Sequence, residues 1–163
     1  MRRKDKALTE LADLEVIILN SPYVTLGLND NGGAYMVPLD FGYESDGKTP
    51  GTLYFHCAVA GRKLDIIKRE PRVSLLFVSQ HKFIDEGDGS LACTLNTDYR
   101  SVMALGLARV IEDDVEKKAA IRCVLKRYGC ENRPVAPEGL AKTALVRVDI
   151  NEAVGKAYQK SPA

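Results

Sequence analysis

The chain has 163 residues, of which 45% are hydrophobic and 28% are charged, and its formal net charge is +1. This length and composition predict a single globular domain over residues 1–163, with enough apolar residues to bury a core. A net charge so close to zero provides no basic field, so we expect no nucleic-acid partner. The longest apolar runs, Val16–Leu19 and Val73–Val78, are too short to cross a bilayer, and no apolar signal core follows the basic N-terminus. We therefore expect a cytoplasmic protein with no membrane partner.

The cysteine pattern favours neither a metal site nor a disulfide framework. The four cysteines form no C-x-x-C pair and stand at Cys57, Cys93, Cys123 and Cys130. Only two histidines, His56 and His81, are available to complete a zinc site, so we predict no bound metal. A chain of this length without a signal peptide rarely relies on disulfides. Free, mostly buried thiols are the expected state.

The first 60 residues combine one helix with three strands. Apolar residues recur at helical spacing within residues 9–20, which predicts a helix that ends before Pro22. Strand-like runs follow at 23–28 and 34–43, and the Asn-Gly-Gly turn between them is a strong hairpin signal. A third strand is expected at 52–57. Because short turns join these three strands, we expect them to form an antiparallel meander.

The rest of the chain alternates strands with helices. Residues 64–69 predict a short helix that stops before Pro71, and residues 72–79 are apolar enough for a strand buried on both faces. Residues 80–97 are polar and glycine-bearing, which suggests a long loop or an irregular hairpin. A strand is then expected at 99–112 and a final one at 143–158.

A third helix is expected between those two strands. Asp113 or Asp114 would cap its start, and the helix would end near Tyr128 and Gly129. Its expected buried positions include Val115, Ala119, Val124 and Leu125. The tally is about six strands and two to three helices, and the strands are mostly consecutive. This pattern predicts a mainly β fold, a small antiparallel barrel with peripheral helices, and not a doubly wound α/β sheet.

Arg62 and Lys63 stand where a strand gives way to a helix. A helix N-terminus offers unpaired N–H groups and a positive dipole end, which attract anions and disfavour cations. A bound anion would remove that conflict, since Arg provides a bidentate fork and Lys a point charge for a phosphate. A basic first turn can also be an ordinary solvated surface. The residues alone therefore predict an anion site and leave the anion open.

Three other features lie near this point or carry polar groups. His56 precedes the two cations in the strand and could donate a proton near neutral pH, although a structural role is the simpler interpretation. Pro38 sits within a strand-like run, which indicates an edge strand or backbone open to a flat ligand. The run Tyr99–Val102 opens its strand with hydroxyls and an arginine. No Rossmann, P-loop or α/β-hydrolase motif occurs in the sequence.

Taken in order, the stretches YMVPLDFGY, LYFHCAVAGRKLDIIKREPRVSLLF and YRSVMALGLARVIED resemble the pyridoxamine 5′-phosphate oxidase-like, FMN-binding split-barrel family. Within that family the chain is most similar to the 5-nitroimidazole-resistance branch. The resemblance implies a six-stranded antiparallel split β-barrel of Greek-key type with two to three peripheral helices. It also implies a homodimer with two FMN molecules at the subunit interface.

The resemblance also assigns roles by motif. Val37, Pro38 and Leu39 would lie along the isoalloxazine ring. His56 and Cys57 would lie near the ring and the ribityl-phosphate end, with a backbone contact expected from Cys57. Arg62 and Lys63 would clamp the phosphate. Tyr99, Arg100 and Ser101 would reach the cofactor from the other subunit.

The leading hypothesis is therefore an FMN-dependent oxidoreductase in which reduced flavin passes electrons to a small substrate such as a nitroaromatic. His56 would be its catalytic proton donor or would orient the substrate. The first alternative is a flavin- or haem-binding module without turnover, with His56 or His81 as the axial ligand of a haem. The second alternative is a dimeric structural protein without a ligand.

Overall fold

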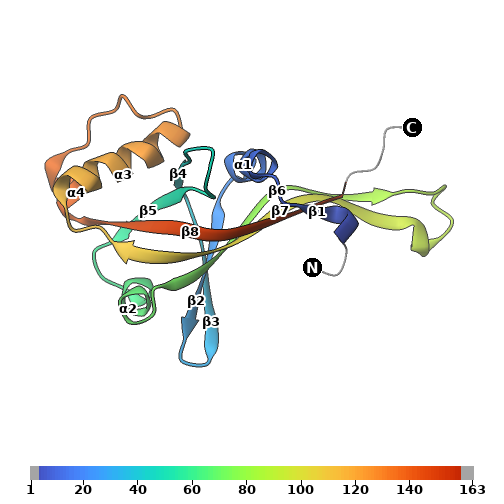
Figure 1. The fold of residues 1–163 in the computed structure, drawn as a ribbon, viewed down its shortest axis with the longest axis horizontal. Coiled ribbons are helices and arrows are strands. Elements are labelled where there is room, and N and C mark those ends of the chain that lie inside the picture. Colours follow the sequence, from blue (N-terminus) through green and yellow to red (C-terminus); the bar gives the residue numbers. More distant parts are fainter. Residues whose placement is uncertain (1–3, 159–163) are drawn as a thin grey trace.

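A computed structural model describes residues 4–158 of the chain. The strands are β1 (Ala7–Leu8), β2 (Val24–Asp30), β3 (Gly33–Leu39), β4 (Gly42–Glu44), β5 (Thr52–Ala58), β6 (Arg72–Asp85), β7 (Leu95–Val110) and β8 (Thr143–Tyr158). The helices are α1 (Leu11–Asn20), α2 (Arg62–Arg69), α3 (Asp114–Arg127) and α4 (Pro137–Ala141), with 3₁₀ turns η1 (Lys4–Lys6) and η2 (Ala92–Thr94). The fold is a mainly β, fully antiparallel sheet with helices outside it, as the sequence predicted (Figure 1).

The sheet is a split barrel because its two ends are joined by a very short link. The strand order is β3-β2-β6-β7-β8-β5-β4, so β3 and β4 are the two edge strands. Only Asp40 and Phe41 separate them in the sequence. Two residues span at most about 11 Å between the flanking Cα atoms. The sheet must therefore curl until its edges approach each other at this link, yet no backbone pairing within residues 4–158 closes it.

Local signals fix two of the turns. Asn31 and Gly32 connect β2 to β3 with φ angles of 48° and 92°, the left-handed pair that a tight hairpin turn requires. Asp113 caps α3, since its carboxylate accepts a hydrogen bond of 2.8 Å from the backbone N–H of Glu116. Both features follow from residues that the sequence analysis singled out.

The main core fills the inner face of the curled sheet. Helix α1 packs Leu14, Ile17 and Ile18 into it, and α2 contributes its own apolar stripe. A second, smaller cluster lies on the opposite face, where α3 covers Tyr54 and Leu145 of β5 and β8. Beyond α3 and α4, whose Leu140 packs against the same cluster, the outer face of the sheet has no helix over it in the described part of the chain (Figure 1).

Several predicted elements need correction. The structure has eight strands where six were expected, because the run 34–43 breaks at Asp40–Phe41 into β3 and β4, and because β1 adds a short pair with β8. The predicted meander is wrong, since β3 does not pair with β5. Instead β4 pairs with β5, and β5 pairs with β8. The three expected helices are present, and α4 adds a short turn within the proline-bearing loop.

The segment 80–97 is more ordered than a loop. Strands β6 and β7 stay paired from Gln80–Arg100 to Asp85–Leu95, with a bulge at Ser79. They form a two-stranded arm that projects from the body of the protein (Figure 1). Strand β6 is also not buried on both faces, because its residues alternate between core and surface along the barrel.

Two further predictions of burial were only partly correct. On α3, Val124 is buried, but Val115 and Ala119 are exposed. The face of α3 that packs against the sheet is narrower than the sequence predicted and is formed by Ala120, Cys123 and Val124. The four cysteines are free thiols, yet only Cys123 is fully buried and Cys93 is exposed on η2. Among residues 4–158, no helix is long and apolar enough to span a membrane.

Contact between α3 and β4 depends on the absence of a side chain at Gly42. A Cβ atom there would lie 2.6 Å from the backbone carbon of Cys123 and 2.6 Å from the nitrogen of Val124. Backbone cannot yield as a flexible side chain can, so we predict that Gly42→Ala lowers the free energy of unfolding by about 1–3 kcal/mol. Urea unfolding followed by circular dichroism measures this change.

The matched control is Gly139→Ala. A Cβ atom at Gly139, in α4, meets nothing within 4 Å, so this variant should stay within about 0.5 kcal/mol of the wild type. Equal midpoints for the two variants would show that α3 can move away from β4 at no cost.

Candidate functional site

The unpaired edges of β3 and β5, together with the start of α2, carry most of the predicted site residues. Strand β4 covers β5 only at Thr52–Tyr54, so residues 55–58 have no strand partner on that edge within the described residues. The outer edge of β3 is likewise unpaired there. The two edge strands β3 and β4 are joined at Asp40–Phe41, and three residues separate the end of β5 from the start of α2. The opening is thus bounded by β3, by the end of β5 and by the start of α2.

The start of α2 combines a helix N-terminus with two cationic side chains. Its N-cap is Gly61, and the N–H groups of Leu64 and Asp65 both donate to the Gly61 carbonyl, at 2.9 and 3.3 Å. The N–H groups of Arg62 and Lys63 therefore stand ahead of the first helical hydrogen bonds, at the positive end of the helix dipole. A negatively charged group placed there would be attracted both by the helix dipole and by the two cationic side chains.

Arg62 is held in place by a network of charges. Its Nε donates to Asp30 Oδ2 at 2.8 Å, and Arg69 Nη2 donates to Asp30 Oδ1 at 2.8 Å. The Arg62 guanidinium carbon also lies 4.9 Å from the centre of the Tyr35 ring on β3. The hydrogen bond from Arg62 is the main reason that the pKa of Asp30 lies below its usual value, and Arg69 adds to it. This network connects α2 to the hairpin of β2 and β3.

Lys63 and Cys57 lie on the same side of the opening. Cys57 is half-buried and packs against the main core. Burial raises the pKa of its thiol, and the positive charge of Lys63 partly opposes that rise. Cys57 therefore stays protonated at neutral pH and has no thiolate to offer as a nucleophile.

The strand residues divide by the face on which they lie. Pro38 and His56 are exposed on the outer face of β3 and β5. Val37 and Leu39 point inward and pack against the core, so only their backbone groups along the open edge can meet a ligand. His56 follows Tyr54 on the same face, just beyond the part of β5 that α3 covers.

Tyr99, Arg100 and Ser101 do not join this group within one subunit. On β8, His56 pairs with Leu145 whereas Ser101 pairs with Lys156. Eleven residues of strand correspond to about 35 Å. The Tyr99 ring instead lies near two ammonium groups, with its centre 6.0 Å from Lys6 Nζ and 5.2 Å from Lys156 Nζ.

Comparison with known proteins shows the family of the chain. The family described as pyridoxamine 5′-phosphate oxidase matches residues 10–157. The chain belongs to that family. No relative was found among curated protein sequences.

Solved structures of the same fold are numerous. A Bacteroides thetaiotaomicron protein described as a 5-nitroimidazole antibiotic resistance protein is 26% identical, with a TM-score of 0.78 over 92% of this chain and 85% of that one. The flavocytochrome Anf3 of Azotobacter vinelandii is 24% identical, with a TM-score of 0.82 over 100% of this chain and 74% of its own. An FAD-binding protein of Mesorhizobium loti is 22% identical, with a TM-score of 0.65 over 94% and 98%.

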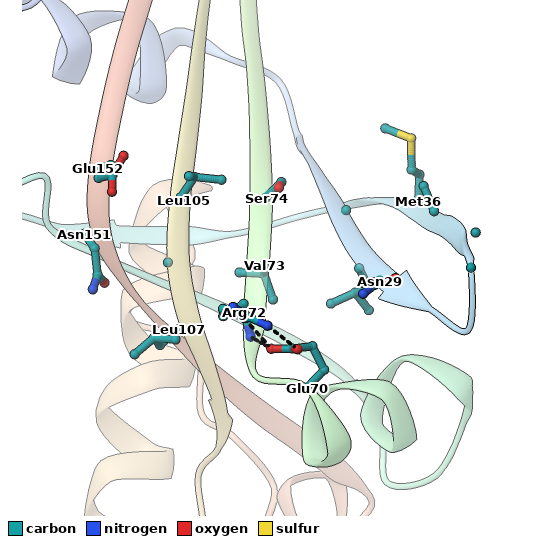
Figure 2. A pocket seen from close by; sticks show the side chains of 16 residues that line it. Asn29, Met36, Glu70, Arg72, Val73, Ser74, Leu105, Leu107, Asn151 and Glu152 are labelled. Carbon is teal, nitrogen blue, oxygen red and sulfur yellow. Dashed lines mark hydrogen bonds and ion pairs between the residues drawn. The ribbon is translucent and has the colours of Figure 1, made fainter.

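This member of the pyridoxamine 5′-phosphate oxidase family also has a groove that sequence reasoning missed. The groove lies on the outer face of β2, β6, β7 and β8 and has a volume of about 820 Å³. Figure 2 shows the side chains that line it, with the paired Glu70 and Arg72 at one end. A second hollow of about 420 Å³ adjoins it. Both are lined by Leu105, and Gly27 leaves their floor flat.

A sequence signal for this surface exists in β7. Within the barrel, the side chains of β7 that point toward the core are small or medium-sized. The side chains that point outward are larger and apolar, and they belong to Met103, Leu105 and Leu107. Alternation in a strand normally places the bulkier apolar residues toward the core. The reversed pattern leaves an apolar surface on the outer face of the sheet.

The ion network at Asp30 gives a testable pH dependence. The pKa of Asp30 is lower in the folded protein than its ordinary value of 3.8. The ionised carboxylate therefore stabilises the fold above pH 3.8, and this stabilisation is lost as the pH falls through the pKa of Asp30 in the folded protein. We predict that Asp30→Asn is less stable than the wild type at pH 7 and that the difference shrinks toward pH 3. Urea midpoints at the two pH values measure it.

Asp13→Asn provides the control, because Asp13 is an exposed carboxylate on α1, away from α2 and the hairpin. It should change the midpoint little at either pH. An Asp30→Asn variant as stable as the wild type at pH 7 would mean that the two arginines contribute nothing to folding.

Proposed function

We propose that the protein is an FMN-dependent oxidoreductase that works as a homodimer on a small-molecule substrate. The observation that carries this proposal is the meeting of three features at one opening: the basic start of α2, the free edge of β3 and the outward-facing His56. Membership in the pyridoxamine 5′-phosphate oxidase family supports a phosphate-bearing flavin as the ligand.

The residues present fit FMN. Arg62 and Lys63, with the N–H groups at the start of α2, would hold the phosphate. The terminal N–H groups of the Arg62 guanidinium stay available for a phosphate, because Arg62 donates to Asp30 through Nε. The edge of β3 at Val37–Leu39 would lie along the flat ring, with Pro38 the one side chain facing outward. Cys57 would contribute its backbone, since its side chain packs inward.

His56 is the residue proposed to move a proton. Bound FMN would supply the electrons for reduction of the substrate. Conversion of a nitro group to a nitroso group takes up two electrons and two protons and releases water. An exposed imidazole beside the opening is suited to deliver one of those protons and to orient the substrate.

The likeness to the Bacteroides protein supports nitroaromatic compounds as one substrate class to test. The homodimer is proposed because Tyr99, Arg100 and Ser101 lie too far from the opening of their own subunit to contribute there. A second subunit could bring these residues to the cofactor.

The proposed phosphate clamp can be tested with two flavins. We predict that Arg62→Ala/Lys63→Ala weakens FMN binding by at least about tenfold, because two charge-assisted contacts are lost. Binding of riboflavin, which has no phosphate, should change little. Fluorescence titration of the apoprotein with each flavin measures both affinities.

Lys68→Ala is the matched control, since it removes an exposed cation near the other end of the same helix. Equal losses for FMN and riboflavin would place the defect in the fold and not in phosphate binding. A wild-type protein that binds no flavin would overturn the proposal, and a Soret band in place of a flavin spectrum would favour the haem-binding alternative.

The role of His56 can be separated from cofactor binding. We predict that His56→Ala retains FMN with nearly unchanged affinity but oxidises more slowly when a nitroimidazole is added to the reduced protein. Loss of a general acid typically lowers a rate about 10²–10⁴-fold. Stopped-flow absorbance of the dithionite-reduced protein measures the rate. An unchanged rate in His56→Ala would remove His56 from the catalytic role.

A further inference from the structure

Helix α3 and the segment that follows it enclose a third hollow. Its volume is about 540 Å³, and pockets that hold small molecules typically measure about 300–1,000 Å³. One wall is α3, and the other is formed by residues 135–141, which include α4 (Figure 1). Among the described residues that line this hollow, none belongs to the proposed flavin site. We call it the α3 groove.

Hydrogen bonds hold the second wall of the groove in place. Where α3 ends, the N–H of Cys130 donates to the Leu125 carbonyl at 2.9 Å, and the N–H of Arg133 donates to the Cys130 carbonyl at 3.0 Å. After α4, the Thr143 hydroxyl donates to the Gly139 carbonyl at 2.8 Å. The segment that faces α3 is therefore tied down at both ends, and the groove is a fixed feature of the fold.

The floor of the groove is apolar. Ile121 on α3 and Leu140 on α4 are half-buried, and both pack against the small core cluster that contains Tyr54 and Leu145. Val135 also lines the groove and keeps 39% of its surface exposed. A ligand with an apolar body would remove part of these side chains from water, which favours binding in proportion to the apolar area covered.

The charged side chains along the groove are mostly positive. Lys117, Lys118 and Arg122 line it together with one carboxylate, that of Asp114. Lys117 Nζ lies 3.6 Å from Asp114 Oδ1, so these two charges balance each other. Lys118 and Arg122 make no ion pair within residues 4–158. Two positive charges at the groove are thus left unbalanced by these contacts.

The spacing of the two cations fits an anion between them. Lys118 and Arg122 stand four residues apart on α3, which places them on the same face of the helix, where like charges repel each other. A carboxylate between them would accept hydrogen bonds from both and remove the repulsion. Ile121 lies three residues from Lys118 on that same face. A carboxylate held by the two cations therefore directs its apolar body over the floor of the groove.

We propose that the α3 groove binds a small carboxylate with an apolar body, such as a short- or medium-chain fatty acid. The carboxylate lies between Lys118 and Arg122, and the apolar body covers Ile121, Leu140 and Val135. Both parts of the ligand contribute to the affinity, because the groove combines unbalanced positive charge with an apolar floor. This site is separate from the proposed flavin site and does not depend on it.

Three probes separate the contributions of charge and apolar surface. We expect hexanoate to bind at least about tenfold more tightly than acetate, which lacks the apolar body, and than 1-hexanol, which lacks the charge. Isothermal titration calorimetry on the full-length protein measures the three affinities. Hexanoate that binds no more tightly than acetate, or no more tightly than 1-hexanol, would overturn the proposal.

A charge variant tests the location of the site. Lys118→Ala/Arg122→Ala should lower the affinity for hexanoate by at least about tenfold, because both charge-assisted contacts are lost. Lys68→Ala/Lys126→Ala is the matched control, since it removes the same net charge at two exposed lysines that do not line the groove. Circular dichroism confirms that both variants fold. Wild-type affinity in Lys118→Ala/Arg122→Ala would place hexanoate on another surface and overturn the proposal.

The apolar side of the groove is tested at Val135, which is exposed enough to be replaced without opening the core. Val135→Ser should weaken the binding of hexanoate and leave that of acetate unchanged. Val115→Ser is the matched control, because Val115 is an exposed valine on α3 that does not line the groove. Equal hexanoate affinities for the two variants would overturn the proposed position of the apolar body. Either failure leaves FMN binding untouched, since none of these residues lies at the flavin site.

Discussion

The rest of the structure depends on the two-residue link between β3 and β4. Because Asp40 and Phe41 join strands at opposite ends of the sheet, the sheet must curl into a barrel. The same curl leaves an unclosed edge on either side of the link, and the proposed ligand site lies along that opening. Phe41 is fully buried and packs edge-on against Phe77, with ring centres 5.4 Å apart. The link therefore anchors the core as well as the geometry of the site.

The curl also explains the unusual side-chain pattern of β7. The interior of a tightly rolled sheet has little room, so Ala104, Gly106 and Ala108 point inward where larger residues would crowd the core. A Cβ atom at Gly106 would lie 2.5 Å from the Asp149 carbonyl oxygen. The larger residues are left to the outer face, where Met103, Leu105 and Leu107 are exposed. Barrel packing and the apolar outer face are thus two consequences of one constraint.

Local sequence signals predicted most of the individual elements, but they could not predict which strands pair with one another across the sheet. The Asn-Gly turn, the Asp113 cap and the strand-to-helix change at Gly61 each depend on a few neighbouring residues and were read correctly. The meander failed because sequence patterns do not say which edge a strand joins. The motif segments Val37–Leu39 and His56–Cys57 lie on the unpaired edges of β3 and β5, and Arg62–Lys63 begin α2, so their shared role in one site stays a prediction. Asp30 was missed because its role arises only where β2 ends beside α2.

The charges around α2 suggest how the site stays folded without a ligand. Two arginines and a basic helix start would repel one another if left alone, but Asp30 lies between Arg62 and Arg69 and balances them. Its side chain is only 13% exposed, whereas that of Arg62 is 66% exposed. The carboxylate is therefore the fixed element and the guanidinium the one that can reach outward. A bound phosphate would share Arg62 with Asp30 and need not displace it, so the hairpin and the helix would keep their relative position on binding.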